Sequence, residues 1–484
     1  MNMITVLLVL VPLITGLATF LMKGKTSRGW ALVSAIVTLV IAAGCVLTFQ
    51  TDPGSLTVDV PWITQLGARF SFGLDGVGTM MVLLTAISYV VVLLSSWKRE
   101  LAKPQQFYGL MLLMQAGLMG VFISFDALLF YAFWELVIIP AYFLSSIWGG
   151  KKRIPVTFKF FVYTFFGSLL MLIGIIYLYF QTPGAHSFSW EAFKSLRLDE
   201  TQQSWLFWLF FVAFAIKMPV FPFHTWQPDT YEQSPTPVTM ILSAVMVKMG
   251  LVGVIRWVLP VLPDGAAYWG HFVMILCIIG IVYASCIALV QTDLKRLFAY
   301  SSIAHMGLMS AVIFSGTVVG TQGVLIQMFN HGIIILGLWV VVEAIEEKLG
   351  TRDINQLGGL ATKAPRLAIA FVLVCLGNIG LPLTSGFIGE FMMFAGLYQY
   401  NAWMMFFAGL AIILVAIYTL RMLQKVLFGE TNALTEKVID LRANEWLALA
   451  VVIVLILAVG IYPKPVLDIL QHTTHALLAS NPLP

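Results

Sequence analysis

The sequence carries very little charge for its length. Asp, Glu, Lys and Arg make up only 10% of its 484 residues, whereas a soluble domain has about 25%. Apolar residues make up 60% of the chain, and the mean hydropathy is +0.93. These values exclude an ordinary soluble enzyme, a disordered chain and a protein that binds nucleic acid through a basic surface.

Cysteine is also scarce. No two cysteines have the C-x-x-C spacing of a metal or redox site, and all of them lie in apolar stretches. We interpret them as small apolar core residues and expect no redox centre, metal site or disulfide framework in this chain. They are Cys45, Cys277, Cys286 and Cys375. No polar connection between the apolar runs is long enough to fold as a catalytic domain.

Long apolar runs, in contrast, are abundant. A membrane-spanning helix needs about 20 predominantly apolar residues. The sequence therefore predicts an all-α polytopic membrane protein with about fourteen transmembrane helices. The predicted segments are 3–22, 30–49, 76–97, 107–123, 126–147, 157–180, 204–226, 236–259, 270–290, 296–314, 319–346, 366–398, 402–427 and 444–462. The first lacks a preceding basic region, so we interpret it as a span and not as a signal peptide.

The basic residues sort to one side of this topology. Most of the 27 Lys and Arg residues flank alternate connections, beginning with the one after the first segment. Because cytoplasmic loops carry the excess of Lys and Arg, this side is expected to face the cytoplasm. We expect a cell inner (plasma) membrane protein with both termini outside, on the periplasmic side.

Four ionisable residues stand in the middle of apolar segments: Glu135, Lys217, Lys248 and Glu390. Each costs roughly 2.5–3.5 kcal/mol at the bilayer centre, so such residues are usually functional. A buried lysine loses its proton more readily than an exposed one, and a buried glutamate holds its proton more firmly. Two acids and two bases of this kind favour a chain of exchangeable protons. The alternative is a set of ion pairs that only fixes helix packing.

Prolines and glycines interrupt two of the predicted spans. Pro219 and Pro222 follow Lys217 in FAIKMPVFPFHTWQPD, and we expect the carbonyls of Ala215 and Met218 to be left free for the lysine. Glycines and a proline likewise precede Glu390 in GNIGLPLTSGFIGE. Broken helices at membrane depth line cavities, and pairs of them occur in inverted repeats. The two breaks are five spans apart, which predicts two inverted five-helix repeats.

Three histidines lie in or beside the spans: His224, His305 and His331. Imidazole can relay protons near neutral pH, and Ser301, Ser302 and Asn330 supply polar neighbours. Hydrogen-bonded structural histidines are the alternative.

Another cation, Arg256, stands near a span end. It is expected to extend its charge to the surface, as long basic side chains do at membrane interfaces.

Several motifs together resemble the antiporter-like membrane subunits of respiratory complex I, and subunits of the M type most closely. They are FYAFWELVIIP, FAIKMPVFPFHTWQPD, SSIAHMG, the Asn330–His331 pair and GLPLTSGFIGE. The resemblance implies N-terminal helices in 1–106, inverted repeats in 107–259 and 270–427, and a last helix with a tail in 444–484. It also implies proton translocation by Glu135, Lys217, Lys248 and Glu390, with His224, His305 and His331 as relays.

The resemblance further implies a subunit of NADH:quinone oxidoreductase that translocates protons while quinone is reduced elsewhere in the complex. This chain would hold no cofactor, whereas FMN, iron–sulfur clusters and quinone would be bound by partner subunits. Its partners would be neighbouring antiporter-like subunits, the lipid bilayer and protons, and not nucleic acid.

Two other functions stay open. The stretch YEQSPTPVTMIL is similar to subunits of multisubunit sodium/proton antiporters and membrane-bound hydrogenases. The acid at Glu390 favours complex I, because the antiporter subunits often have a lysine there. The second open function is a membrane scaffold whose ion pairs only fix helix packing.

Overall fold

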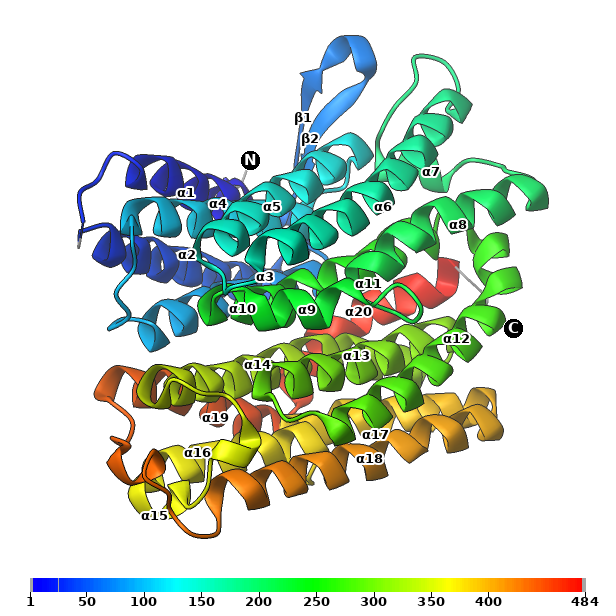
Figure 1. The fold of residues 1–484 in the computed structure, drawn as a ribbon. Helices are drawn as coiled ribbons and strands as arrows, with labels where there is room; N and C mark the ends of the chain where they lie inside the picture. The colour runs from blue at the N-terminus through cyan, green and yellow to red at the C-terminus, as the bar shows by residue number, and fades with distance from the viewer. Residues whose placement is uncertain (1–2, 25, 481–484) are drawn as a thin grey trace.

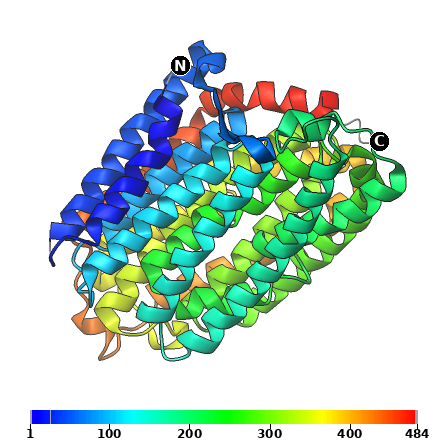
Figure 2. The same ribbon diagram turned by 90° about the horizontal axis from the view of Figure 1, so that it is seen from above.

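The structure is a computed structural model that describes residues 3–24 and 26–480. Lys25 and the outermost ends of the predicted segments 1–106 and 444–484 lie outside the described residues. Long helices lie side by side through most of the molecule (Figures 1 and 2), with one small hairpin at an edge.

Among its described residues, the N-terminal half of the chain forms ten α-helices and the hairpin. The helices are α1 (Ile4–Thr19), α2 (Thr26–Thr51), α3 (Gly76–Ser95), α4 (Pro104–Ile123), α5 (Ala127–Trp148), α6 (Arg153–Gln181), α7 (Trp190–Lys194), α8 (Glu200–Lys217), α9 (Trp226–Gln233) and α10 (Thr236–Ile241). The strands β1 (Val58–Ile63) and β2 (Ala68–Phe72) pair antiparallel, with Val58 opposite Phe72.

The C-terminal half is helical within the described residues. Its helices are α11 (Lys248–Gly253), α12 (Pro263–Val290), α13 (Leu294–Val312), α14 (Val318–Leu349), α15 (Leu360–Lys363), α16 (Pro365–Ile379), α17 (Ser385–Tyr400), α18 (Ala402–Leu427), α19 (Ala443–Ile461) and α20 (Lys464–Ser480). A π-helical turn, η3 (Leu242–Met246), joins α10 to α11, and a second one, η4 (Val254–Val258), follows α11, so that residues 236–258 form one continuous segment.

Within the described residues, eleven helical segments are long and apolar enough to cross a membrane, and α1 and α16 are shorter apolar helices. The prediction of an all-α polytopic membrane protein is therefore confirmed. Helices suit this environment because they satisfy every backbone polar group within the segment, where lipid offers no hydrogen bonds.

Both predicted interruptions are present. The first lies between α8 and α9, where Val220 N donates to Ala215 O at 2.9 Å and Trp226 Nε1 donates to Ile216 O at 2.9 Å. The expectation that the Ala215 carbonyl is free for Lys217 is therefore wrong, because the turn itself supplies a backbone donor. The second lies between α16 and α17, where Gly380 adopts a φ of 75°.

The predicted C-terminal tail contains a further helix, α20. Figure 2 shows it along one edge of the bundle, at an angle to the long helices. Thr473 Oγ1 on α20 accepts a hydrogen bond from Gly76 N at the first residue of α3, at 2.8 Å. The tail thereby covers a helix start whose N–H groups would otherwise lack partners.

Arg256 does not extend to the surface as expected. Its side chain is 2% exposed, and its guanidinium donates to both carboxylate oxygens of Asp75 at 3.1 Å. It also donates to the carbonyls of Phe122 at 2.9 Å and Ser124 at 3.3 Å. The end of α4, the loop before α5 and the N-cap of α3 thus give the arginine a set of acceptors inside the protein, so that it does not need to reach water.

We predict that Asp75→Asn lowers the thermal stability of the assembled protein. Breaking a buried pair leaves an uncompensated charge, which costs about 3–5 kcal/mol. The measurement is the midpoint temperature of unfolding in detergent. Asp468→Asn is the matched control, because its partner Lys464 lies on an exposed turn of α20 at 2.7 Å, and it should leave the midpoint unchanged. Equal midpoints for both variants would contradict the prediction.

Candidate functional site

Lys248 lies on the segment built from α10, η3 and α11, and it is fully buried. Its Nζ donates to the carbonyl of Ser243 and to Nδ1 of His331 on α14, both at 2.9 Å. When Lys248 carries its proton, its ammonium can only donate, so His331 Nδ1 accepts and the neutral imidazole carries its hydrogen on Nε2. Lys248 and His331 are therefore linked directly.

His305 on α13 and Glu390 on α17 form the next pair. His305 Nδ1 bonds to the carbonyl of Ser301 at 2.8 Å, and its Nε2 lies 3.3 Å from Glu390 Oε1. A carbonyl only accepts, so Nδ1 carries a hydrogen, and Nε2 shares a second proton with the carboxylate. The rings of His305 and His331 are 5.3 Å apart between centroids. Lys248, His331, His305 and Glu390 thus form a continuous series, which we call the central chain.

Glu135 on α5 and Lys217 at the end of α8 form a separate pair. Lys217 Nζ lies 5.2 Å from the centre of the Trp134 ring, and the lysine interacts electrostatically with Glu135. Among the described residues, neither Lys217 Nζ nor Glu135 Oε1 has a hydrogen-bond partner. The two groups therefore interact by charge, without a hydrogen bond at these two atoms.

Glycine brings the pair close to the central chain. A Cβ at Gly250 would lie 2.6 Å from the carbonyl of Phe214, so only glycine lets α11 approach α8 this closely. Lys217 and Lys248 belong to these two packed helices.

His224 does not join the central chain. It lies in the interruption between α8 and α9, is 3% exposed, and packs beside the rings of Phe221 and Tyr283. The structure thus brings six of the seven predicted residues into two neighbouring groups and leaves His224 outside them.

Two residues that the sequence did not single out contact the central chain through Ser301. Tyr418 on α18 donates to Ser301 Oγ at 2.9 Å, and Asn378 on α16 approaches the same oxygen at 3.4 Å. Asn330, which the sequence did indicate, donates to the carbonyl of Ser385 at 2.7 Å and ties α14 to the start of α17. A single tyrosine in an apolar span gives no sequence signal of this kind.

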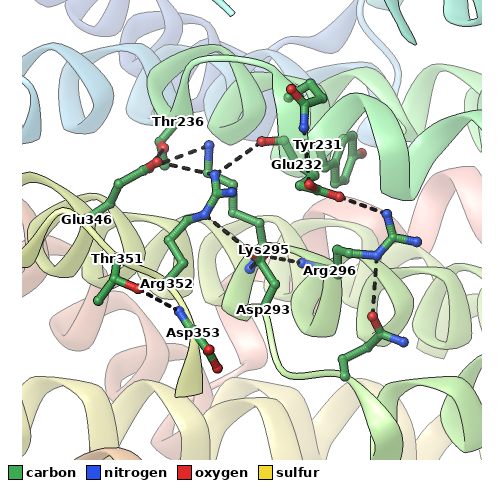
Figure 3. Close-up of polar contacts among 12 residues, drawn as sticks. Tyr231, Glu232, Thr236, Asp293, Lys295, Arg296, Glu346, Thr351, Arg352 and Asp353 are labelled. Atoms are coloured by element: carbon green, nitrogen blue, oxygen red, sulfur yellow. Dashed lines mark hydrogen bonds and ion pairs between the residues drawn. The ribbon is translucent and has the colours of Figure 1, made fainter. Parts of the chain in front are cut away.

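A second polar cluster lies near the ends of α13 and α14, at the side rich in Lys and Arg (Figure 3). Glu346 accepts from Thr236 at 2.8 Å and lies 3.6 Å from the buried Lys295. Arg352 bonds to Glu346 at 3.2 Å and to Asp293 at 3.1 Å. We call this cluster the basic-face network; the remaining members are Arg99, Asp229, Glu232, Arg296 and Glu343.

The network anchors α14, the helix that carries His331. Arg99, from the connection between α3 and α4, reaches Glu343 on α14 at 2.5 Å. Lys348, in the last turn of α14, reaches Glu445 of α19 at 2.5 Å. The end of this helix is therefore held by charges from several other elements.

The four cysteines are free within the described residues, and Cys286 is exposed on α12. The interpretation of every cysteine as a core residue is therefore wrong for Cys286. No group of three His, Cys, Asp or Glu side chains that could hold a metal ion occurs in the described part of the chain.

Known proteins share this sequence and fold. The family model of the NADH:quinone oxidoreductase/Mrp antiporter transmembrane domain matches residues 124–416. NADH-quinone oxidoreductase subunit M of Rickettsia prowazekii (strain Madrid E) is 37% identical over 459 residues, which cover 94% of this chain and 93% of the relative. The chain belongs to the subunit M family of NADH:quinone oxidoreductase.

Two further matches show the range of this subunit M family. A chain of respiratory complex I from Thermus thermophilus is 29% identical and superposes with a TM-score of 0.92, over 99% of this chain and 100% of that one. F(420)H(2) dehydrogenase subunit M of Methanosarcina mazei is 35% identical, over 98% of this chain and 97% of the relative. The family identification from sequence motifs is confirmed.

We predict that Gly380→Ala impairs the site at Glu390. A Cβ at Gly380 would lie 2.6 Å from Glu390 Oε2, and its left-handed backbone would cost an alanine about 1–2 kcal/mol. The expected result is a loss of NADH:quinone oxidoreductase activity per assembled complex in membranes. Gly409→Ala is the control, because its Cβ would meet no atom within 4 Å. Wild-type activity of Gly380→Ala would show that the carboxylate position tolerates displacement.

Proposed function

We propose that this subunit translocates protons across the membrane through Glu135, Lys217, Lys248 and Glu390, coupled to quinone reduction elsewhere in the complex. The observation that carries the proposal is the central chain. It joins Lys248 to Glu390 through two imidazoles, with a contact at every step. Each member can gain or lose a proton, which a chain of arginines could not do.

The proposed sequence of events begins at Glu135. Its charge biases the protonation of Lys217, and the charge of Lys217 in turn acts on Lys248. His305 would first deliver its Nε2 proton to the Glu390 carboxylate, which leaves that nitrogen free to accept another. A proton released by Lys248 would then pass to His331 Nδ1, and the Nε2 hydrogen of His331 would replace the one that His305 lost. Glu390 would exchange its proton with the outer face. His224, which lies outside this chain, would serve only the region of the first break.

The same proposal includes the layout in the membrane. Segments 107–259 and 270–427 would form two inverted five-helix repeats among fourteen spans, since each contains one interrupted helix. The side of the basic-face network would face the cytoplasm by the positive-inside rule, and both termini would lie on the periplasmic side.

The redox chemistry would belong to other subunits. FMN, iron–sulfur clusters and quinone would be bound there, and neighbouring antiporter-like subunits would contact this chain within the bilayer. The free energy of their reaction would reach this chain as a change of charge or position near Glu135.

We predict that Lys248→Ala and Glu390→Gln abolish coupled proton uptake into inverted membrane vesicles. Each substitution removes a protonatable group from the central chain. NADH oxidation, proton uptake and assembly on native gels are measured together, with Lys194→Ala as a control at the opposite, exposed end of the protein. Full turnover and uptake in both variants would leave only the scaffold function. Sodium-dependent dissipation of a pH gradient without NADH-linked activity would favour the antiporter function.

A further inference from the structure

A cavity of about 220 Å³ opens at the Lys- and Arg-rich face, between the C-terminal ends of α12 and α18. Two cations line this cavity, Arg421 and Lys425, and no carboxylate of the described residues does. They stand four residues apart on one face of α18, a spacing at which like charges repel each other. An anion in the cavity would relieve this repulsion.

The acids near the cavity do not supply this anion. Asp293, which follows the cavity-lining end of α12, already bonds to Arg352 at 3.1 Å. Lys425 Nζ donates to the neutral side-chain amide of Asn355 at 2.9 Å. The guanidinium of Arg421 makes no hydrogen bond or ion pair within the described part of the chain. The two cavity cations thus differ from the arginines of the basic-face network, which are paired with acids.

Exposed apolar side chains continue from the cavity toward the middle of the membrane. Ile417 and Ile413 stand about one and two turns deeper than Arg421 on the same face of α18, and they are 47% and 59% exposed. This stripe is about 12 Å long by helical rise. Val290 lines the cavity from α12 and is 73% exposed. A cationic cavity beside an apolar stripe fits a molecule with an anionic head and an apolar tail.

We propose that the cavity binds the head group of an anionic phospholipid from the membrane leaflet at the Lys- and Arg-rich face. Arg421 holds the phosphate through two parallel N–H bonds, and Lys425 adds a point charge. The acyl chains lie over Ile417 and Ile413. Basic pockets between transmembrane helices are known to bind anionic head groups.

The same residues disfavour a zwitterionic lipid. Its head group adds a cation, and the described lining of the cavity has no carboxylate to receive one. The inference goes beyond the proposed function and does not rest on it, because no residue of the central chain lines the cavity.

The first test measures access to the cavity in the purified complex. Thr292 lines the cavity and is exposed, so Thr292→Cys places a thiol there. Cys286→Ser is combined with it, because Cys286 is the exposed native cysteine of the described chain. The rate of maleimide labelling of this subunit is measured in detergent with phosphatidylglycerol, phosphatidylcholine or inorganic phosphate.

We expect phosphatidylglycerol to slow this labelling roughly tenfold when it is present at ten times its Kd, as mass action requires. Phosphatidylcholine and inorganic phosphate should leave the rate unchanged. Thr362→Cys, at an exposed position of α15 outside the cavity, is the control and should be labelled at one rate in all three conditions.

The second test removes the two cations. Arg421→Gln with Lys425→Gln, added to the Thr292→Cys protein, should abolish the protection by phosphatidylglycerol. Lys363→Gln with Lys437→Gln is the matched control, because it removes the same charge from exposed positions outside the cavity. Protection in this control should equal that of the protein with all four cations.

Equal labelling rates with phosphatidylglycerol and phosphatidylcholine would overturn the proposal, and so would protection that survives the loss of Arg421 and Lys425. Protection by inorganic phosphate as strong as that by phosphatidylglycerol would make the cavity a site for a free anion and would also overturn it. None of these results bears on the proton path, which Lys248→Ala tests separately.

Discussion

Burial of the Lys248 ammonium is the constraint on which the central part of the structure depends. A charge at this depth must find acceptors inside the protein, and Lys248 finds the Ser243 carbonyl and His331 Nδ1. Ser243 belongs to the π-helical turn η3, a distortion that is frequent at functional sites. His331 must in turn be held by α14, so the lysine fixes the relation of two helices that are far apart in sequence.

The structure contains two kinds of charged cluster. The side chains in each determine what the cluster can do. The basic-face network is built around Arg99, Arg296 and Arg352, and an arginine keeps its proton at any physiological pH. Such a cluster can hold α14 in place but cannot pass protons along. The central chain contains only Lys, His and Glu, whose protons exchange. Rigid anchoring therefore lies at the membrane surface, and exchangeable charge lies at its centre.

The sequence indicated each charged residue of the site, but it did not indicate the pairs Lys248–His331 and His305–Glu390. An ionisable residue in an apolar run is visible by itself, which is why Lys217, Lys248 and Glu390 could be predicted. Pairing depends on contacts between distant segments, such as the 83 residues between Lys248 and His331. Arg256 was misjudged for the same reason, because its partner Asp75 lies 181 residues earlier. Hydropathy, in contrast, is a local property, so the class of fold followed directly from it.

The two groups of site residues differ in how they can communicate. Lys248 is bonded to His331, and His305 lies 3.3 Å from Glu390, while the two imidazole rings lie 5.3 Å apart between centroids. Lys217 Nζ and Glu135 Oε1 have no hydrogen-bond partner among the described residues, yet a charge acts over several ångströms in a medium of low dielectric constant. In the proposed function, the first pair therefore controls the chain by its field while the protons themselves move in the second. In this arrangement the free energy of the redox reaction can act on Glu135 and Lys217, although no proton moves from these two residues to the central chain.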